Sequence, residues 1–354
     1  MPNLNKKFKV TEFVIMGFLG NLVSCDIGID LGTANILIYV IGEGIVVDEP
    51  SIVAIETKTR RVLAVGAEAK EMVGRTPGEI ITVRPLREGV IADFEVAEEM
   101  LRILLKRVIK NRFLVRPRVV IGVPSGITEV EKRAVRLSAE RVNAREIYLV
   151  SEPMAGAIGV GIDVHEPMGS MIIDIGGGTS EIAVIALSGI VNGATSIRIG
   201  GDKLDDAIIQ YLKKNYNLLV GERTAEEIKK NIGSACPLDE EINMDIKGRD
   251  LVAAIPRTIN ISSVEIREAI ADPINAITDA VLLSLERMPP EVAADILDRG
   301  IILTGGGALL RGLDRRIRDE TNLPVHVAED PLTCVVKGTG KILENITFYR
   351  KVLF

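Results

Sequence analysis

Three short glycine-rich segments hold the residues of this sequence that could do chemistry. Each follows an apolar run and combines glycines with an aspartate or a threonine. Glycine lets backbone N–H groups approach a phosphate closely, although a single Asp-x-Gly turn is more often an ordinary hairpin. Three such segments in one chain predict a nucleotide site. Their residues are Asp30 with Gly32, Thr33, Ala34 and Asn35; Asp174 with Gly176, Gly177, Gly178 and Thr179; and Thr304 with Gly305, Gly306, Gly307 and Ala308.

The chemistry expected at these segments is phosphate and magnesium binding. The carboxylates of Asp30 and Asp174 are expected to hold Mg²⁺ through water, because this ion keeps much of its hydration shell. The sequence contains neither GxxxxGK[ST] nor GxGxxG, which excludes a P-loop and a dinucleotide fingerprint. Two opposed turns are therefore expected to clamp the phosphates from either side. The third turn is expected to precede a helix, whose N-terminus would favour an anion or nucleotide.

The first two segments also form a weak internal repeat. Residues 27–34 read IGIDLGTA and residues 172–179 read IIDIGGGT, so each consists of an apolar strand, an aspartate and a glycine turn with a threonine. They lie about 140 residues apart, which is one domain length. The repeat predicts two related half-folds that face each other.

Apolar β-branched runs alternate with helical patterns from Ile27 onward, which predicts a mixed α/β fold. Continuous apolar strands are expected at residues 119–123, 171–175 and 301–303, in sheets that are covered on both sides. After Asp93 a helix is expected to bury one face. That face comprises Val96, Met100, Leu101, Leu104 and Val108. Capping boxes are predicted at Thr128 with Glu131, Thr224 with Glu227, and Ser262 with Glu265.

Composition fits a folded protein of two domains or lobes, because 354 residues exceed one ordinary core and 47% are hydrophobic. The net charge of −6 argues against a general nucleic-acid binder. Cys25, Cys236 and Cys334 form no CxxC pair, which favours neither a zinc site nor disulfides and suits a reducing cytoplasm. His165 and His326 are the two histidines, and we do not expect either to be catalytic.

Longer strings of the chain resemble the actin, sugar-kinase and heat-shock-chaperone ATPase superfamily, and most closely the MreB family of bacterial actin homologues. The resemblance runs from about Asp26 to Leu343. Ile36 and Gly156 differ from the threonine and alanine common in that family. The strings are DLGTAN at 30–35, GRTPG at 74–78, EGVIADFE at 88–95, VPSG at 123–126, EPMAGAIG at 152–159, GSMIIDIGGGT at 169–179, RTAEEIK at 223–229 and LTGGGALLRGL at 303–313.

The resemblance implies an actin-like α/β fold. Two lobes would each have a ribonuclease H-like α/β core and a smaller subdomain, with the nucleotide cleft between the lobes. The implied parts are an N-terminal extension at 1–25; subdomain IA at 26–44, 87–158 and 328–354; subdomain IB at 45–86; subdomain IIA at 159–193 and 259–327; and subdomain IIB at 194–258.

The resemblance also implies roles for individual residues, with ATP, or alternatively GTP, and Mg²⁺ as cofactors. Glu152 and Thr179 would orient the water that attacks the γ-phosphate, because phosphoryl transfer needs positioning and electrostatics more than a strong base. Asp30 and Asp174 would support catalysis through Mg²⁺. An adenosine-binding helix would contribute Thr224, Glu226, Glu227 and Lys229, and Gly305 to Ala308 would pack beneath the adenine. Alternatively, Glu152 is a helix-start carboxylate and Glu226 forms a surface pair with Lys229.

Two segments could bind membrane. Residues 6–23 put lysines before an apolar stretch that is shorter than the roughly 20 residues of a spanning helix. Residues 22–25 resemble a lipoprotein cleavage box, but an ATP-dependent protein has little use outside the cytoplasm, and Cys25 leads directly into a strand. A peripheral anchor is expected; the alternatives are a frayed tail or a translation start at Met16.

The second segment, residues 110–118, is an apolar tip with basic neighbours. Phe113 and Leu114 could insert shallowly into an anionic leaflet while the basic side chains bind headgroups. The alternative is a loop folded back on its own core. The resemblance favours membrane contact. The basic residues are Lys110, Arg112, Arg116 and Arg118.

The function that the resemblance implies is a cytoplasmic, membrane-bound cytoskeletal ATPase that maintains rod shape by guiding cell-wall synthesis. Its partners would be further copies of the chain, anionic lipids at the inner face of the cell membrane, and membrane proteins of cell shape and cell-wall synthesis, with no nucleic acid. Protofilaments would form head to tail and pair antiparallel near Val130. The alternatives are a small-molecule kinase, although residues 45–86 offer few specificity groups, and a chaperone, although no substrate domain follows.

Overall fold

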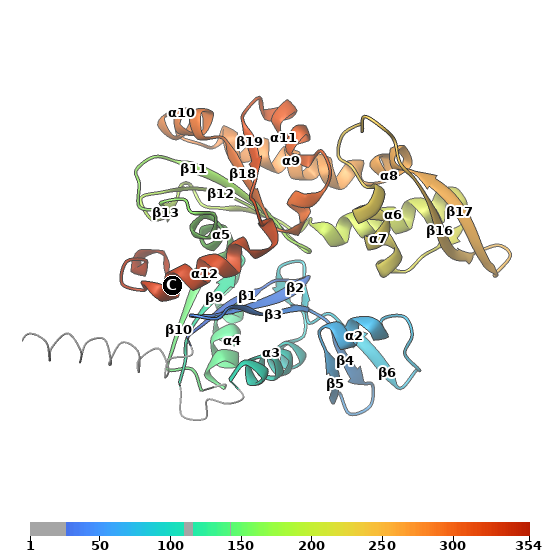
Figure 1. The fold of residues 1–354 in the computed structure, drawn as a ribbon, viewed down its shortest axis with the longest axis horizontal. Coiled ribbons are helices and arrows are strands. Elements are labelled where there is room, and N and C mark those ends of the chain that lie inside the picture. The colour runs from blue at the N-terminus through green and yellow to red at the C-terminus, as the bar shows by residue number, and fades with distance from the viewer. Residues whose placement is uncertain (1–25, 110–115, 142) are drawn as a thin grey trace, which may run out of the picture.

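Two sheets with the same strand order form the centres of the two lobes (Figure 1). The computed structural model describes residues 26–109, 116–141 and 143–354. The first sheet runs β10-β9-β1-β2-β3 and the second runs β13-β12-β11-β18-β19. The strands are β1 Ile27–Leu31, β2 Asn35–Val40, β3 Gly44–Pro50, β9 Arg118–Val123, β10 Glu146–Ser151, β11 Ser170–Ile175, β12 Ser180–Ala186, β13 Gly189–Ile190, β18 Ile301–Thr304 and β19 Val325–Val327.

The pairing pattern confirms the predicted repeat. Strand β1 is antiparallel to β2 and parallel to β9, and β11 is in the same way antiparallel to β12 and parallel to β18. Asp30 and Asp174 each stand one residue before the end of the equivalent strand. The glycine turn that follows each aspartate is the hairpin connection to β2 or β12. Thus each turn is both a hairpin and a candidate ligand-binding loop.

Helices α5 (Glu152–Val160) and α12 (Cys334–Glu344) lie between the two sheets (Figure 1). Helix α12 packs on β1 and β9 of the first lobe, while α5 packs on β11 and β12 of the second. Their crossing is very close, because a Cβ atom placed on Gly338 would lie 1.8 Å from the carbonyl oxygen of Ala155. The two lobes are therefore joined by ordered, nearly backbone-to-backbone helix packing.

The outer faces of the sheets are covered by further helices, which agrees with the continuous apolar character of the strands. Helices α3 (Phe94–Ile109) and α4 (Glu129–Glu140) cover the first sheet, and α9 (Ala271–Glu286), α10 (Pro290–Arg299) and α11 (Leu313–Thr321) cover the second (Figure 1). The predicted apolar face of α3 is buried, with Val108 partly buried at its edge.

The two smaller subdomains project from the lobes at one end of the molecule (Figure 1). The first contains β4 Val53–Glu56, β5 Val62–Val65, α2 Ala67–Met72 and β6 Ile80–Val83, followed by the hairpin β7 Leu86–Arg87 and β8 Val90–Ile91. The second contains α6 Gly201–Tyr216, β15 Leu218–Leu219, α7 Glu222–Ile232, β16 Asn243–Asp250, β17 Pro256–Ser262 and α8 Ser263–Ala269.

Strand pairing corrects three expected boundaries. Residues 45–50 belong to β3, which pairs with β2 in the first main sheet, so the smaller subdomain begins after Pro50 and not at residue 45. Strand β14 (Thr195–Ile197) pairs with β12 and belongs to the second main sheet, although residue 194 was the expected start of the smaller subdomain. Strand β17 pairs with β16 as far as Ser262, beyond the expected end at 258.

Two of the three predicted capping boxes are confirmed. Thr128 with Glu131 caps α4, and Ser262 with Glu265 caps α8. The box at Thr224 is wrong, because α7 begins at Glu222 with Gly221 as its N-cap. Thr224 therefore lies inside the first turn of the helix, where its own backbone is already helical.

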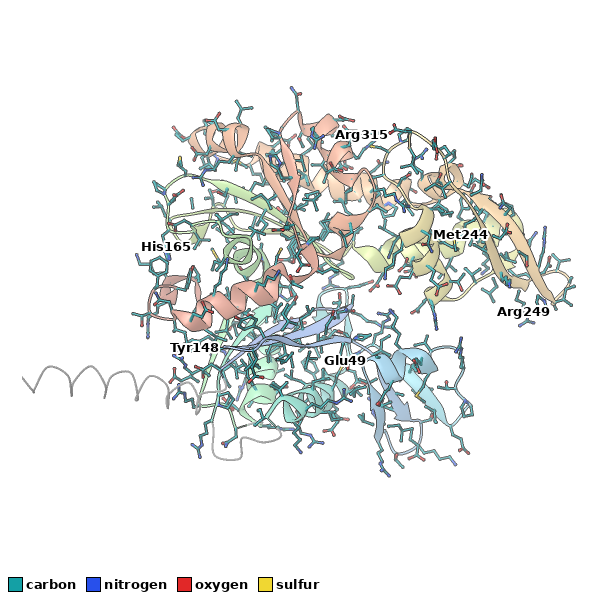
Figure 2. All side chains as sticks on the ribbon, viewed as in Figure 1. Glu49, Tyr148, His165, Met244, Arg249 and Arg315 are labelled. Atoms are coloured by element: carbon teal, nitrogen blue, oxygen red, sulfur yellow. The ribbon has the colours of Figure 1, made fainter. Side chains whose placement is uncertain are left out.

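Several sequence predictions lie outside the described residues. These are the N-terminal extension at 1–25 with Cys25, and Phe113 and Leu114 of the basic loop. Within the described ranges, no helix has the length and apolar character needed to cross a bilayer. His165 lies on the side of the molecule away from the smaller subdomains (Figure 2). It packs edge-on against Phe348, with ring centroids 4.1 Å apart, and does not line the cavity described below.

Candidate functional site

A cavity of about 660 Å³ lies between the lobes, and all three glycine turns line it. It extends between the smaller subdomains, where α7 and residues 84–91 form part of its wall. Most of the residues predicted for a nucleotide site meet here. Those that line the cavity are Asp30, Gly32, Thr33, Ala34, Asn35, Glu152, Asp174, Gly176, Gly177, Gly178, Thr179, Glu226, Lys229, Gly305, Gly306 and Gly307.

The first two turns touch each other directly across the lobes. The backbone N–H of Gly178 donates a hydrogen bond to the hydroxyl oxygen of Thr33 at 2.8 Å. A Cβ atom on Gly177 would stand 2.7 Å from the Cβ of Ala34, and one on Gly178 would stand 2.7 Å from the backbone nitrogen of Glu88. Contacts this short are not tolerated by real side chains, so the glycines are required by the approach of the lobes as well as by any phosphate.

Protein donors hold the carbonyl groups of both turns. In the second turn, the N–H groups of Gly201 and Asp202 at the start of α6 donate to the carbonyl oxygens of Gly176 and Gly177 at 3.0 and 2.8 Å. In the first turn, the Ser51 hydroxyl donates to the carbonyl oxygen of Gly32 at 2.6 Å. The backbone of each turn is thus fixed before any ligand binds, which lowers the ordering cost of binding.

Three carboxylates at the inner end of the cavity have raised pKa values. Burial, followed by the charge of Asp174, raises the pKa of Asp30 to about 8. Burial raises the pKa of Asp174 to about 6, although the Thr304 hydroxyl, which donates to its Oδ1 at 3.1 Å, acts in the opposite direction. The pKa of Glu152 lies well above its usual range because of burial and the neighbouring charge of Glu181.

This electrostatic arrangement fits a divalent cation bound with phosphates. Within the described part of the chain, the residues that shift the pKa values of Asp30 and Glu152 are all acidic. No three acidic, histidine or cysteine side chains of the described residues converge tightly enough to hold a metal by themselves. Mg²⁺ characteristically uses one or two carboxylates, several waters and substrate phosphates, which this donor set can supply.

Glu152 satisfies both interpretations of its sequence position. It is the first residue of α5, so it is a helix-start carboxylate, and its side chain also faces the cavity. Thr179 is buried in the second turn, on the opposite lobe. The two side chains predicted to orient a water therefore approach the cavity from different lobes.

The third turn packs against the second strand–turn unit. Gly305 has a φ angle of +80°, and a Cβ atom there would lie 2.5 Å from Oδ1 of Asp174. The expected α-helix does not follow directly: residues Gly306–Leu309 form the 3₁₀ turn η1, and α11 begins only at Leu313. The helix N-terminus predicted at this turn is therefore wrong. Ala308 is buried beneath the turn and does not line the cavity.

Helix α7 presents Glu226 and Lys229 to the cavity but not Thr224 or Glu227. Glu227 is exposed and pairs with Arg223 at 3.2 Å. The alternative of a Glu226–Lys229 surface pair is wrong, because each residue has another partner. Lys229 contacts Asp205 at 2.9 Å and so ties α7 to α6.

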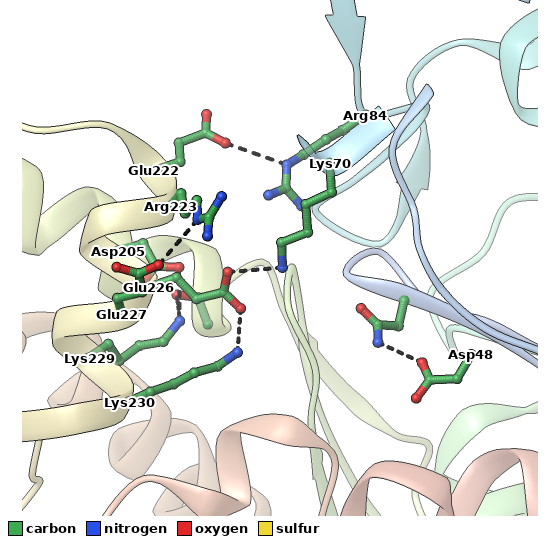
Figure 3. A network of polar contacts seen from close by, with 12 residues as sticks. Asp48, Lys70, Arg84, Asp205, Glu222, Arg223, Glu226, Glu227, Lys229 and Lys230 are labelled. Carbon is green, nitrogen blue, oxygen red and sulfur yellow. Dashed lines mark hydrogen bonds and ion pairs between the residues drawn. The ribbon is translucent and has the colours of Figure 1, made fainter. Parts of the chain in front are cut away.

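Ion pairs cross the open side of the cleft between the smaller subdomains (Figure 3). Lys70 on α2 contacts Glu226 at 3.2 Å, and Arg84 contacts Glu222 at 3.6 Å. Burial favours the neutral form of Glu226, but the hydrogen bond from Lys230 and the charge of Lys70 outweigh it and lower its pKa to about 2. Sequence analysis missed Lys70 and Arg84, because partners so distant along the chain share no local spacing.

The paired lobes, their common strand order and the facing glycine turns define an actin-like fold, as the sequence predicted. The family model described as MreB/Mbl protein matches residues 24–351, and the chain belongs to this family. This membership supports the predicted cell-shape class over the small-molecule kinase alternative.

Individual relatives agree with this assignment. The chain is 54% identical over 338 residues to the cell shape-determining protein MreB of Escherichia coli K12, covering 94% of this chain and 97% of that protein. It is 49% identical to the cell shape-determining protein Mbl of Bacillus subtilis 168, covering 91% and 96%.

Solved structures show the same fold. MreB5 of Spiroplasma citri bound to ADP superimposes with a TM-score of 0.87 at 40% identity, covering 93% of this chain and 98% of that one. A structure of the same protein bound to AMPPNP has a TM-score of 0.86. The MamK double helical filament, at 22% identity, has a TM-score of 0.78 and shares the fold.

The raised pKa of Asp30 predicts that the chain without Mg²⁺ and nucleotide loses stability as the pH rises. The folded state binds this proton up to about pH 8, whereas the unfolded chain releases it near the ordinary value of 3.8. The unfolding free energy must therefore fall across this interval. The melting temperature of Asp30→Asn should decline less between about pH 5 and pH 8 than that of the wild type. Parallel curves would contradict this, and Asp298→Asn on exposed α10 is the matched control.

The ion pairs across the cleft predict faster nucleotide release in Lys70→Glu. The change replaces an attraction to Glu226 by a repulsion, and half-exposed pairs of this kind are worth up to about 1 kcal/mol each. Release of a fluorescent ATP analogue, followed by stopped flow, should accelerate by up to about ten-fold, and less at high salt. Arg102→Glu, which breaks a pair with Glu99 within α3 and lies outside the cavity lining, should leave the rate near that of the wild type. An unchanged rate in Lys70→Glu would show that these pairs do not restrain the nucleotide.

Proposed function

We propose that this chain is an ATP-hydrolysing cytoskeletal protein that polymerises at the inner face of the cell membrane and maintains rod shape by organising cell-wall synthesis. The observation that carries the proposal is the pair of glycine turns in direct contact above buried carboxylates. The ADP- and AMPPNP-bound structures of its relative MreB5 support nucleotide binding at the same fold.

The geometry suggests separate roles for the residues around ATP. The backbone N–H groups of the first two turns bind the phosphates, and Asp30 and Asp174 are the residues that would hold Mg²⁺. When bound, the ion neutralises charge on the phosphates. Glu152 and Thr179, one from each lobe, orient the attacking water. Glu226 contacts the ribose, and residues 305–307 lie beside the base.

Hydrolysis is slow and coupled to polymerisation. The state of the bound nucleotide therefore determines when filaments assemble and disassemble. The partners of the chain are further copies arranged head to tail, anionic lipids, and membrane proteins of cell shape and cell-wall synthesis. The apolar tip with Phe113 and Leu114 and the N-terminal segment contact the membrane. A head-to-tail contact uses two different surfaces and does not close, which is the geometry that generates a filament.

Sedimentation with ATP, Mg²⁺ and anionic liposomes tests this function. The wild type should pellet with the liposomes as filaments and release phosphate. Glu152→Gln should still pellet, because the change leaves phosphate contacts intact, while phosphate release falls at least about ten-fold. A chain that stays in the supernatant under all nucleotide conditions would contradict a polymerising ATPase and favour an enzyme that acts as a soluble monomer.

The pairing surface predicts a second result. Val130 lies on α4 with 73% of its surface exposed, and an apolar side chain so placed suits a contact between copies. Val130→Glu would bury a charge in that contact and should leave single protofilaments in electron micrographs. Val264→Glu, at a half-exposed position on α8 of the other lobe, should leave the pairs intact. Double filaments formed by Val130→Glu would exclude this surface.

A further inference from the structure

A fourth carboxylate, that of Glu181, lies behind the phosphate turns and has no role in the binding scheme above. Glu181 is on β12 and directly opposite Asp174 in the antiparallel pair with β11, so the two side chains lie on the same face of the sheet. It is 1% exposed. A carboxylate this deeply buried is costly unless it is hydrogen-bonded, so its contacts are informative.

The principal contact of Glu181 crosses from one lobe to the other. Its Oε2 accepts a hydrogen bond from the backbone N–H of Ser125 at 2.8 Å. Ser125 belongs to the first lobe, two residues after the end of β9, whereas Glu181 belongs to the second. This hydrogen bond therefore joins the two lobes. Together with the Thr33–Gly178 bond, it gives a second point at which the lobes are joined.

Each residue of this pair has one further polar atom beside the direct hydrogen bond. Oε1 of Glu181 and Oγ of Ser125 are both buried, and neither has a hydrogen-bond partner among the described residues. Two such oxygens in one small region would be costly if left unpaired. Buried waters typically satisfy groups of this kind. A water between these two oxygens would satisfy both, in addition to the direct hydrogen bond between Glu181 and Ser125, which is called the tie between the lobes below.

The tie stands beside the two groups that are proposed to orient the attacking water. Thr179 is two residues before Glu181 and directly precedes β12, which begins at Ser180. On the other lobe, Ser151 pairs with Val123 in the parallel strands β10 and β9, which places the next residue, Glu152, alongside the turn that contains Ser125. The separation of Thr179 and Glu152 thus depends on the contact between Glu181 and Ser125.

We propose that Glu181 is a positioning residue for hydrolysis, which fixes Glu152 and Thr179 relative to each other by tying β12 to the turn after β9. This inference rests on the proposed ATPase function. Glu181 acts through the hydrogen bond that its carboxyl oxygen accepts from Ser125, which its side-chain length permits, and its charge is not required. Because a displacement of about 1 Å at a catalytic group can cost 10²-fold in rate, loss of the tie should lower kcat more than it changes KM.

Two conservative variants distinguish the side-chain length of Glu181 from its charge. Glu181→Asp keeps the charge but is one methylene shorter, so it withdraws the oxygen from Ser125. Glu181→Gln keeps the reach and an amide oxygen that can accept the same hydrogen bond. Phosphate release by the full chain with ATP and Mg²⁺ should show kcat at least about ten-fold lower in Glu181→Asp, with KM within about threefold. Glu181→Gln should keep kcat within about threefold of the wild type.

Several results would overturn the inference. The reverse order of the two variants would mean that the charge itself acts, and equal kcat in all three proteins would mean that the tie has no role. A parallel loss of melting temperature, nucleotide affinity and kcat in Glu181→Asp would indicate a purely structural residue. Failure of the proposed function is distinguishable, because the wild type would then release no phosphate.

Discussion

The contact between two backbone turns across the cleft is the constraint on which the rest of the structure depends. Thr33 and Gly178 meet at hydrogen-bond distance, and the neighbouring glycines leave no space for side chains. The lobes can be this close only because α5 and α12 cross equally closely behind them. The floor of the cavity, the position of the carboxylates and the width of the space for phosphates all follow from this approach.

Electrostatics acts against this closed arrangement. Asp30, Glu152 and Asp174 face one cavity, and their raised pKa values reflect first the burial of each carboxylate and then the charges of neighbouring acidic groups. At the open side of the cleft, the pairs Lys70–Glu226 and Arg84–Glu222 act in the opposite sense and draw the smaller subdomains together. A bound cation would relieve the repulsion at the inner end without disturbing the attraction at the outer end.

The sequence predicted the α/β fold, the repeat and most of the cavity lining, because strand–aspartate–glycine units carry a local pattern. Local patterns also gave a wrong helix start. Thr224 and Glu227 have capping-box spacing, but α7 already begins at Glu222 with Gly221 as its N-cap. The contacts of Lys70, Arg84 and Glu181 were not predictable, because each depends on residues that are far apart in sequence. The boundary near Pro50 was missed because sheet membership is decided by pairing with β2.

The common strand order has a consequence for symmetry. Strands β9 and β18 occupy equivalent places in the two sheets, so the turn with Ser125 and the third glycine turn are structural counterparts. Both turns line the cavity, the first-lobe turn through Pro124 and Ile127 and the second-lobe turn through its glycines, but the first-lobe turn also receives Glu181. The site is therefore nearly symmetrical around the first two turns but differs between the lobes at this place. An asymmetric ligand would meet glycine backbone on one side and a turn held by a carboxylate on the other, so the two ends of the ligand would not be interchangeable.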